Sequence, residues 1–128
     1  MEYETIETSS SRIWLDENGI LHTVNRPGCC FDLAAAQENI HAVRNFLNGR
    51  KVPVAVDLRG TRSVSREARQ YYAKEDGAVE TLATALIVDS PVGRIIGNFF
   101  IGLHKPKSPV KIFDIETEAV EWLKGFLD

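Results

Sequence analysis

The most constraining stretch of this sequence runs from Val52 to Arg69. It begins with a short apolar run, Val52 to Val56, whose β-branched bias is typical of a buried strand. Asp57 ends this run, a compact loop around Gly60 follows, and Ser65 begins a helical pattern. A buried strand, a polar loop and a helix N-terminus form the arrangement at which α/β sheets place ligand or partner sites. The stretch therefore predicts an α/β fold and a position for its site.

Strand and helix patterns alternate along the rest of the chain. Strands are expected at residues 12–15, 20–24, 52–56, 81–88 and 110–113, and Asn18-Gly19 is typical of a tight hairpin between the first two. Helices are expected after the N-caps Asp32, Ser65, Ser90 and Asp114, over residues 33–47, 65–75, 92–103 and the C-terminal segment. Residues 1–10 fit either an edge strand or a frayed end.

This alternation predicts an α/β fold with a mostly parallel four- to five-stranded sheet, an N-terminal antiparallel hairpin strand and four helices. The 128 residues suit a single domain, residues 1–128. A net charge of −3 argues against a general nucleic-acid binder. Neither a secretory signal nor an apolar run long enough to span a membrane is visible, so we expect a cytoplasmic protein without stable membrane insertion.

Candidate reactive residues are few. Cys29 and Cys30 are adjacent, which disfavours pairing between them, and small buried residues are the better interpretation. The three histidines, His22, His41 and His104, lack the spacing of metal ligands. No nucleophile elbow, P-loop or dinucleotide-binding glycine motif is present. We therefore expect no metal, no cofactor and no enzymatic activity.

The best candidate site is the arginine turn, residues 59–69, which carries four arginines and two serines, namely Arg59, Arg62, Ser63, Ser65, Arg66 and Arg69. A helix N-terminus offers unpaired N–H groups and partial positive charge, so these arginines could bind a phosphate, a carboxylate or an acidic partner. The alternative is a solvated loop whose arginines pair with nearby acids.

The segment 92–103 is apolar almost all round and is expected to be a buried helix. Its outward face, represented by Ile96, Phe99, Phe100 and Leu103, fits three roles. It could form a homodimer interface, line a groove for a hydrophobic ligand, or belong to the ordinary core.

Several stretches resemble a group of small bacterial STAS-like proteins of unknown function. They are Ser11-Arg-Ile-Trp-Leu, Val56-Asp-Leu-Arg-Gly, Ser65-Arg-Glu-Ala-Arg, Gly97-Asn-Phe-Phe and Glu121-Trp-Leu. The element order, a hairpin followed by four βα units, also resembles the STAS domain of anti-sigma-factor antagonists and the lipid-binding CRAL-TRIO fold.

The STAS resemblance implies a phosphorylated serine at the start of the helix after the central strand. Aligning Asp57 and Gly60 with that motif places Arg66 at the acceptor position, and only a shift in alignment brings Ser63 or Ser65 there. We therefore expect a non-enzymatic regulatory or protein-interaction module of STAS type without the serine switch. It would use the arginine turn and the 92–103 helix to meet another protein and would form a homodimer. The alternative is a carrier of a small hydrophobic or amphipathic anionic ligand, whose head the arginines hold and whose tail Phe99 and Phe100 cover.

Overall fold

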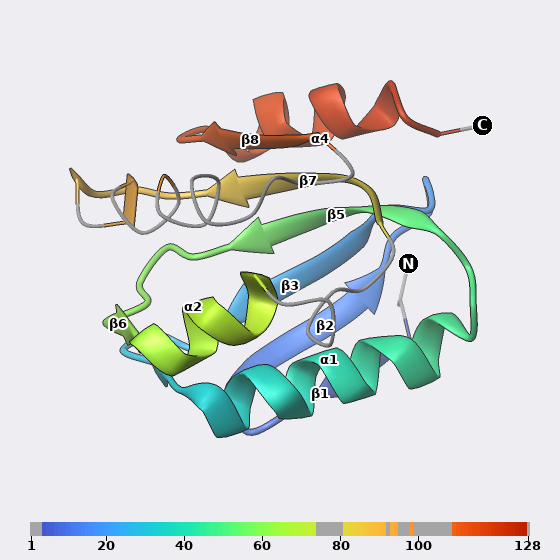
Figure 1. The fold of residues 1–128 in the computed structure, drawn as a ribbon. Helices are drawn as coiled ribbons and strands as arrows, with labels where there is room; N and C mark the ends of the chain where they lie inside the picture. Colours follow the sequence, from blue (N-terminus) through green and yellow to red (C-terminus); the bar gives the residue numbers. More distant parts are fainter. Residues whose placement is uncertain (1–3, 74–80, 92, 95–97, 99–108, 128) are drawn as a thin grey trace.

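The protein is described by a computed structural model that covers residues 4–73, 81–91, 93–94, 98 and 109–127. Within these residues the main sheet has six strands in the order β1-β2-β3-β5-β7-β8, and β4 and β6 form a separate two-stranded sheet (Figure 1). The strands are β1 (Thr5–Glu7), β2 (Ser11–Leu15), β3 (Leu21–Asn25), β4 (Cys30–Phe31), β5 (Val52–Asp57), β6 (Ser63–Val64), β7 (Thr81–Ile87) and β8 (Val110–Phe113). The helices are α1 (Leu33–Leu47), α2 (Arg66–Ala73) and α4 (Glu116–Lys124).

The predicted hairpin is confirmed. Gly19 adopts a φ of 94°, and the side chain of Asp16 accepts hydrogen bonds from the backbone of Asn18 at 2.9 Å and of Ile20 at 3.0 Å. These bonds close the turn between β2 and β3, which pair in antiparallel fashion. The short strand β1 adds an antiparallel edge to β2, which decides between the two interpretations of the N-terminal segment.

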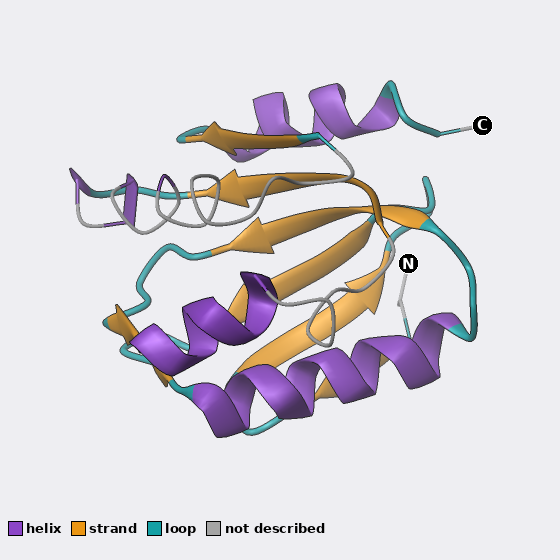
Figure 2. Ribbon diagram, viewed as in Figure 1, coloured by secondary structure: helices purple, strands orange, loops and turns teal. Residues whose placement is uncertain are grey.

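Strand β5 lies at the centre of the parallel part of the sheet, between β3 and β7. Its alternate side chains point to opposite faces. Val52 and Val54 pack with residues of α1, whereas Ala55 packs with residues of α4. Helices α1 and α2 cover one face of the sheet, as Figure 2 shows, and α4 covers part of the other. The mostly parallel α/β sheet is thus as predicted, with one strand more than the expected four to five.

The helix caps follow the sequence with one exception. Asp32 accepts a hydrogen bond from the backbone of Ala35 at 2.9 Å, and Ser65 accepts one from Ala68 at 3.1 Å, so both expected N-caps are confirmed. Asp114 was expected to cap the last helix, and that prediction is wrong. The N-cap is Ile115, whose backbone is extended, so the Asp114 carboxylate lies one residue too early.

The expected helix over 92–103 can be followed only at its start. Ser90 accepts a hydrogen bond from the backbone of Gly93 at 3.0 Å, as an N-cap does. The candidate interface residues Ile96, Phe99, Phe100 and Leu103 lie outside the described residues. Their role as dimer face, ligand groove or core therefore stays a prediction.

Candidate functional site

The parallel strands β3, β5, β7 and β8 all end at the same edge of the sheet, and α1, α2 and α4 begin there (Figure 1). The turn between the antiparallel strands β1 and β2 reaches this edge as well, because Ser11 pairs with Asn25 at the end of β3. In open α/β sheets this carboxyl edge is where ligands and partners bind. The arginine turn, which follows β5, lies at this edge.

Arg59 is paired with acidic side chains and keeps 39% of its own side chain exposed. Its guanidinium binds both carboxylate oxygens of Asp57, at 3.0 and 2.7 Å, and also reaches Glu116 at 3.0 Å. The hydrogen bond to Asp57 is the main reason that the pKa of Arg59 is raised above its ordinary value. Arg59 therefore fastens the first turn of α4 to the end of β5, and its charge is already matched inside the molecule.

Arg62 and Arg66 are directed outward. Both side chains are exposed, as is Ser63 between them, and among the described residues neither arginine forms an ion pair. Ser65 is partly buried because it caps α2, and Arg69 is half-buried one turn into that helix. The structure thus separates the predicted set into one partly exposed arginine that is paired with acids, one half-buried arginine on α2, and an exposed pair that flanks the N-terminus of α2.

The turn is held rigidly by the segment that leads into α1. Strand β4 pairs with β6 in parallel, which places Cys30 beside Ser63. Further backbone hydrogen bonds run from Gly28 to the carbonyl of Gly60 at 2.8 Å and from Arg62 to the carbonyl of Cys29 at 2.8 Å. These contacts fix the backbone on which Arg62 is carried. Two-residue strands have no detectable periodicity, which is why no sequence pattern indicates β4 or β6.

An open pocket of about 620 Å³ lies on the other side of β4. It is lined by the β1–β2 turn, the segment between β3 and α1, and the first two turns of α1: Ser9, Ser10, Arg26, Pro27, Gly28, Cys29, Cys30, Asp32, Ala34, Ala35 and Glu38. Its volume lies within the range of small-molecule ligand pockets. None of these residues except the two cysteines and Asp32 stood out in the sequence.

A buried polar network supports the pocket from beneath. Asn39 of α1 accepts a hydrogen bond from the Thr8 hydroxyl at 2.6 Å and donates one to the Ser11 hydroxyl at 2.8 Å. Ser11 in turn donates to Asn25 at 2.8 Å, and Asn25 donates to Thr61 at 3.1 Å. The network therefore joins the β1–β2 turn, α1, the end of β3 and the arginine turn.

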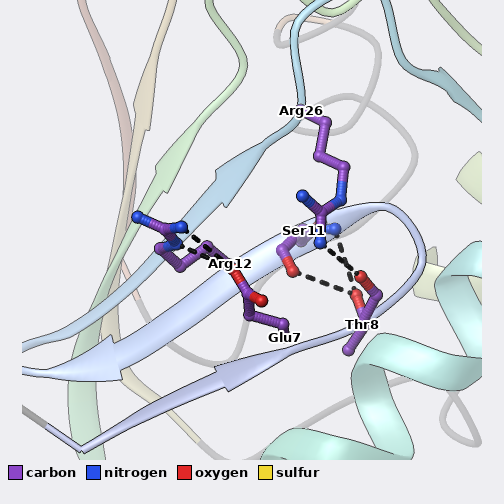
Figure 3. Close-up of polar contacts among 5 residues, drawn as sticks. All are labelled: Glu7, Thr8, Ser11, Arg12 and Arg26. Atoms are coloured by element: carbon purple, nitrogen blue, oxygen red, sulfur yellow. Dashed lines mark hydrogen bonds and ion pairs between the residues drawn. The ribbon is translucent and has the colours of Figure 1, made fainter.

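Figure 3 shows the β1–β2 side of this arrangement. Arg26 reaches from the end of β3 and donates to the backbone carbonyl of Thr8 at 3.1 Å, and the backbone of Ser11 donates to the Thr8 hydroxyl at 3.1 Å. Glu7 and Arg12 form an exposed ion pair at 3.0 Å on the neighbouring positions. The Thr8 to Ser11 turn is consequently anchored from two strands and from α1.

A family described as "Domain of unknown function (DUF7793)" matches residues 13–127 of the chain. The chain belongs to this family. None of the curated proteins matches it.

Two solved structures are similar to this DUF7793 protein. One is an uncharacterized protein from Shewanella loihica PV-4, of the DUF3478 family and with a SpoIIAA-like fold, at a TM-score of 0.55 and 13% identity over 95% of this chain and 92% of that one. The other is a protein with unknown function from Arthrobacter sp. FB24, 30% identical over 92% of this chain and 95% of that one, at a TM-score of 0.38. The first likeness confirms the expected STAS-like fold.

Within this fold the serine positions have clear structural roles. Ser65 uses its hydroxyl oxygen as the cap of α2, and Arg66, at the position that the alignment gives to the phospho-acceptor, is the exposed first residue of the helix. Ser63 is exposed in β6. The geometry therefore presents cations, rather than a hydroxyl, at the place where the resemblance expects a serine.

The cysteines lie in the pocket wall as free thiols. Desolvation, and then the proximity of Cys30 and Asp32, raise the pKa of the Cys29 thiol above 9.0. A thiol with a raised pKa is a poor nucleophile at neutral pH. Cys29 is half-buried against the apolar cluster under α2, whereas Cys30 is exposed, so the expectation of a small buried residue is wrong for Cys30.

The polar network was not foreseen, although the sequence carries a signal for it. Asn39 lies between Ala36 and Val43 at helical spacing, on the face of α1 that is otherwise apolar. A polar side chain on such a face requires buried partners. The partners come from Thr8 and Ser11, more than 25 residues away, and only the fold brings them together.

No helix of the described residues combines the length and apolar character required to cross a membrane.

Proposed function

We propose that this protein is a non-enzymatic STAS-type interaction module that binds an acidic surface of a partner protein through Arg62 and Arg66. The observation that carries this proposal is the pair of exposed guanidinium groups at the N-terminus of α2, for which the described part of the chain supplies no ion-pair partner. A guanidinium can donate two parallel hydrogen bonds to a carboxylate, and the helix N-terminus adds favourable potential for an anion.

The rigidity of the turn supports a binding role. The β4–β6 pairing, the Asn25–Thr61 hydrogen bond and the Arg59–Asp57 ion pair hold the loop from three sides. A loop that is already ordered loses little conformational entropy when a partner binds, so more of the contact energy appears as affinity. Charge complementarity at exposed sites acts mainly on the association rate and on partner choice.

The proposal of a non-enzymatic role is supported by the position and state of the reactive groups. Asp16 and His22 form a close pair at 2.7 Å, but they lie at the amino end of β3, at the opposite edge from the arginine turn. The His22 ring stacks on Trp14, and among the described residues no hydroxyl or thiol contacts it. Cys29, at the correct edge, is kept as a thiol by its raised pKa.

The test is affinity purification from the source organism with three forms of the full chain. The first is the native protein, the second carries Arg62→Glu and Arg66→Glu, and the third carries Lys111→Glu and Lys124→Glu. The control changes net charge by the same amount at exposed positions on β8 and α4. We expect one or more acidic proteins to be retained by the native and control forms and lost from the Arg62/Arg66 variant. Identical recovery by all three forms would exclude the arginine turn as the binding site.

The same purified protein distinguishes the carrier alternative. Native mass spectrometry together with light scattering reports both the oligomeric state, including the expected homodimer, and any bound ligand. Added mass of a few hundred daltons, in line with the size of ligands in such pockets, would favour the carrier over the interaction module.

A further inference from the structure

The pocket beside the arginine turn has charges of the opposite sign. Asp32 and Glu38 place two carboxylates on its α1 wall, and Arg26 is the single cation among its lining residues. The Asp32 carboxylate caps α1 through Oδ1, and Glu38 accepts two hydrogen bonds from Ser9 through Oε1. Among the described residues no donor reaches Asp32 Oδ2 or Glu38 Oε2. Each carboxylate therefore keeps one oxygen for an external donor.

The rest of the lining suits an aliphatic stem. Ala34 and Ala35 on α1 and Pro27 on the facing segment supply small apolar walls. Lysine and arginine side chains bury their methylene groups against such surfaces while the charged end reaches a carboxylate. The Arg26 guanidinium is already engaged, because it donates to the backbone carbonyl of Thr8 at 3.1 Å.

We propose that this pocket receives a basic side chain from the same partner segment whose acidic residues contact Arg62 and Arg66. The inference rests on the proposed function and specifies the partner chemistry, which is a short peptide segment that carries a lysine or arginine close to an aspartate or glutamate. Charge complementarity carries the argument, since the pocket and the turn present opposite charges side by side.

The fold places the pocket wall beside the arginine turn. Cys30 lines the pocket and pairs with Ser63, the residue after Arg62. Paired strands lie about 4.8 Å apart. At Cys30 and Ser63 the pocket wall and the arginine turn are therefore one strand spacing apart, within reach of a single short partner segment.

The experiment is a selection of random twelve-residue peptides displayed on phage, with the immobilised full chain as bait. Asp32→Asn with Glu38→Gln removes both pocket charges but keeps an N-cap of equal quality and an oxygen for Ser9 to donate to. Arg62→Gln with Arg66→Gln neutralises the turn. Glu118→Gln with Glu121→Gln, at exposed positions on α4, is the matched control for carboxylate loss.

We expect the enriched peptides to carry a basic residue together with an acidic one. Their affinity should fall about tenfold or more for the pocket variant and for the turn variant, and stay within about twofold for the control. Replacing the basic residue of a peptide by norleucine should weaken binding to the native protein and have little further effect on the pocket variant.

The unfavourable outcomes separate the two claims. The selection could enrich acidic peptides that need no basic residue and that bind the pocket variant as tightly as the native protein. That result would overturn this inference and leave the proposed function intact. Peptides that bind the turn variant as well as the native protein would overturn both, because the acidic contact would then be absent.

Discussion

Replacement of Asn39 by alanine should destabilise the protein strongly, although it removes only one polar side chain. The side chain is 3% exposed and makes hydrogen bonds to Thr8 at 2.6 Å and to Ser11 at 2.8 Å. Two such bonds contribute about 1–1.5 kcal/mol each, and the groups left behind are buried. Alanine returns about 0.5 kcal/mol through its higher helix propensity. The expected loss in the free energy of unfolding is therefore about 2 kcal/mol.

The assay is equilibrium urea denaturation followed by tryptophan fluorescence, in which the midpoint should fall while the slope stays constant. Asn45→Ala is the matched control, because it makes the same substitution in the same helix at an exposed position. That variant should stay within about 0.5 kcal/mol of the native protein.

A double-mutant cycle adds a second check. Because Ser11 and Asn39 share a hydrogen bond, Ser11→Ala should cost about 1 kcal/mol less in the Asn39→Ala background than in the native protein. If Asn39→Ala unfolds at the same urea concentration as Asn45→Ala, or if the two substitutions are fully additive, the network does not hold the carboxyl edge as described.

Three other predictions concern the caps, the internal ion pair and pH. In the same urea assay, Ser65→Ala should lower the free energy of unfolding by about 1 kcal/mol, because it removes the cap of α2. Asp114→Ala should lower it by less than about 0.5 kcal/mol. Equal losses would mean that Asp114 acts as a cap. Arg59→Ala should lower the free energy of unfolding by about 1–3 kcal/mol, because it leaves the buried Asp57 carboxylate without its ion-pair partner. Arg59→Lys should restore part of the loss. An unchanged urea midpoint for Arg59→Ala would contradict this prediction. Desolvation raises the pKa of Tyr72 above 10.0 in the folded state. The contribution of Tyr72 to stability should therefore be constant below that pH and be lost as the pH rises through and beyond it, because the unfolded tyrosine ionises first. Thermal unfolding between pH 8 and 11 should show this fall, and Tyr72→Phe should reduce it; an equal fall in both proteins would assign it to other groups.

Local signals in the sequence were sufficient for most of the fold. The Asn18-Gly19 turn, the caps at Asp32 and Ser65, and the apolar run that begins at Val52 each depend on interactions between near neighbours. Asp114 shows the limit of such signals. An aspartate before a helical pattern is a good cap candidate, but the backbone of Ile115 decides where the helix begins.

The candidate site was predictable only in part, because its groups come from distant segments. The arginine turn was found from its composition, but which of its arginines is paired depends in part on a distant residue such as Glu116, 57 residues from Arg59. The pocket is formed by three segments that have no shared motif. The face of the 92–103 helix, which the sequence offered as a dimer interface or ligand groove, lies outside the described residues and stays a prediction.

The most direct test of the central claim is the affinity of a captured partner for the native protein and for the charge variants. Isothermal titration at two salt concentrations would compare Arg62→Glu/Arg66→Glu with the Lys111→Glu/Lys124→Glu control. We predict that reversal of the turn raises the dissociation constant about tenfold or more, which is about 1.4 kcal/mol per tenfold. The native affinity should also weaken as salt increases, and the control should match the native protein at both concentrations. Equal dissociation constants for the native protein and the Arg62/Arg66 variant would contradict the account.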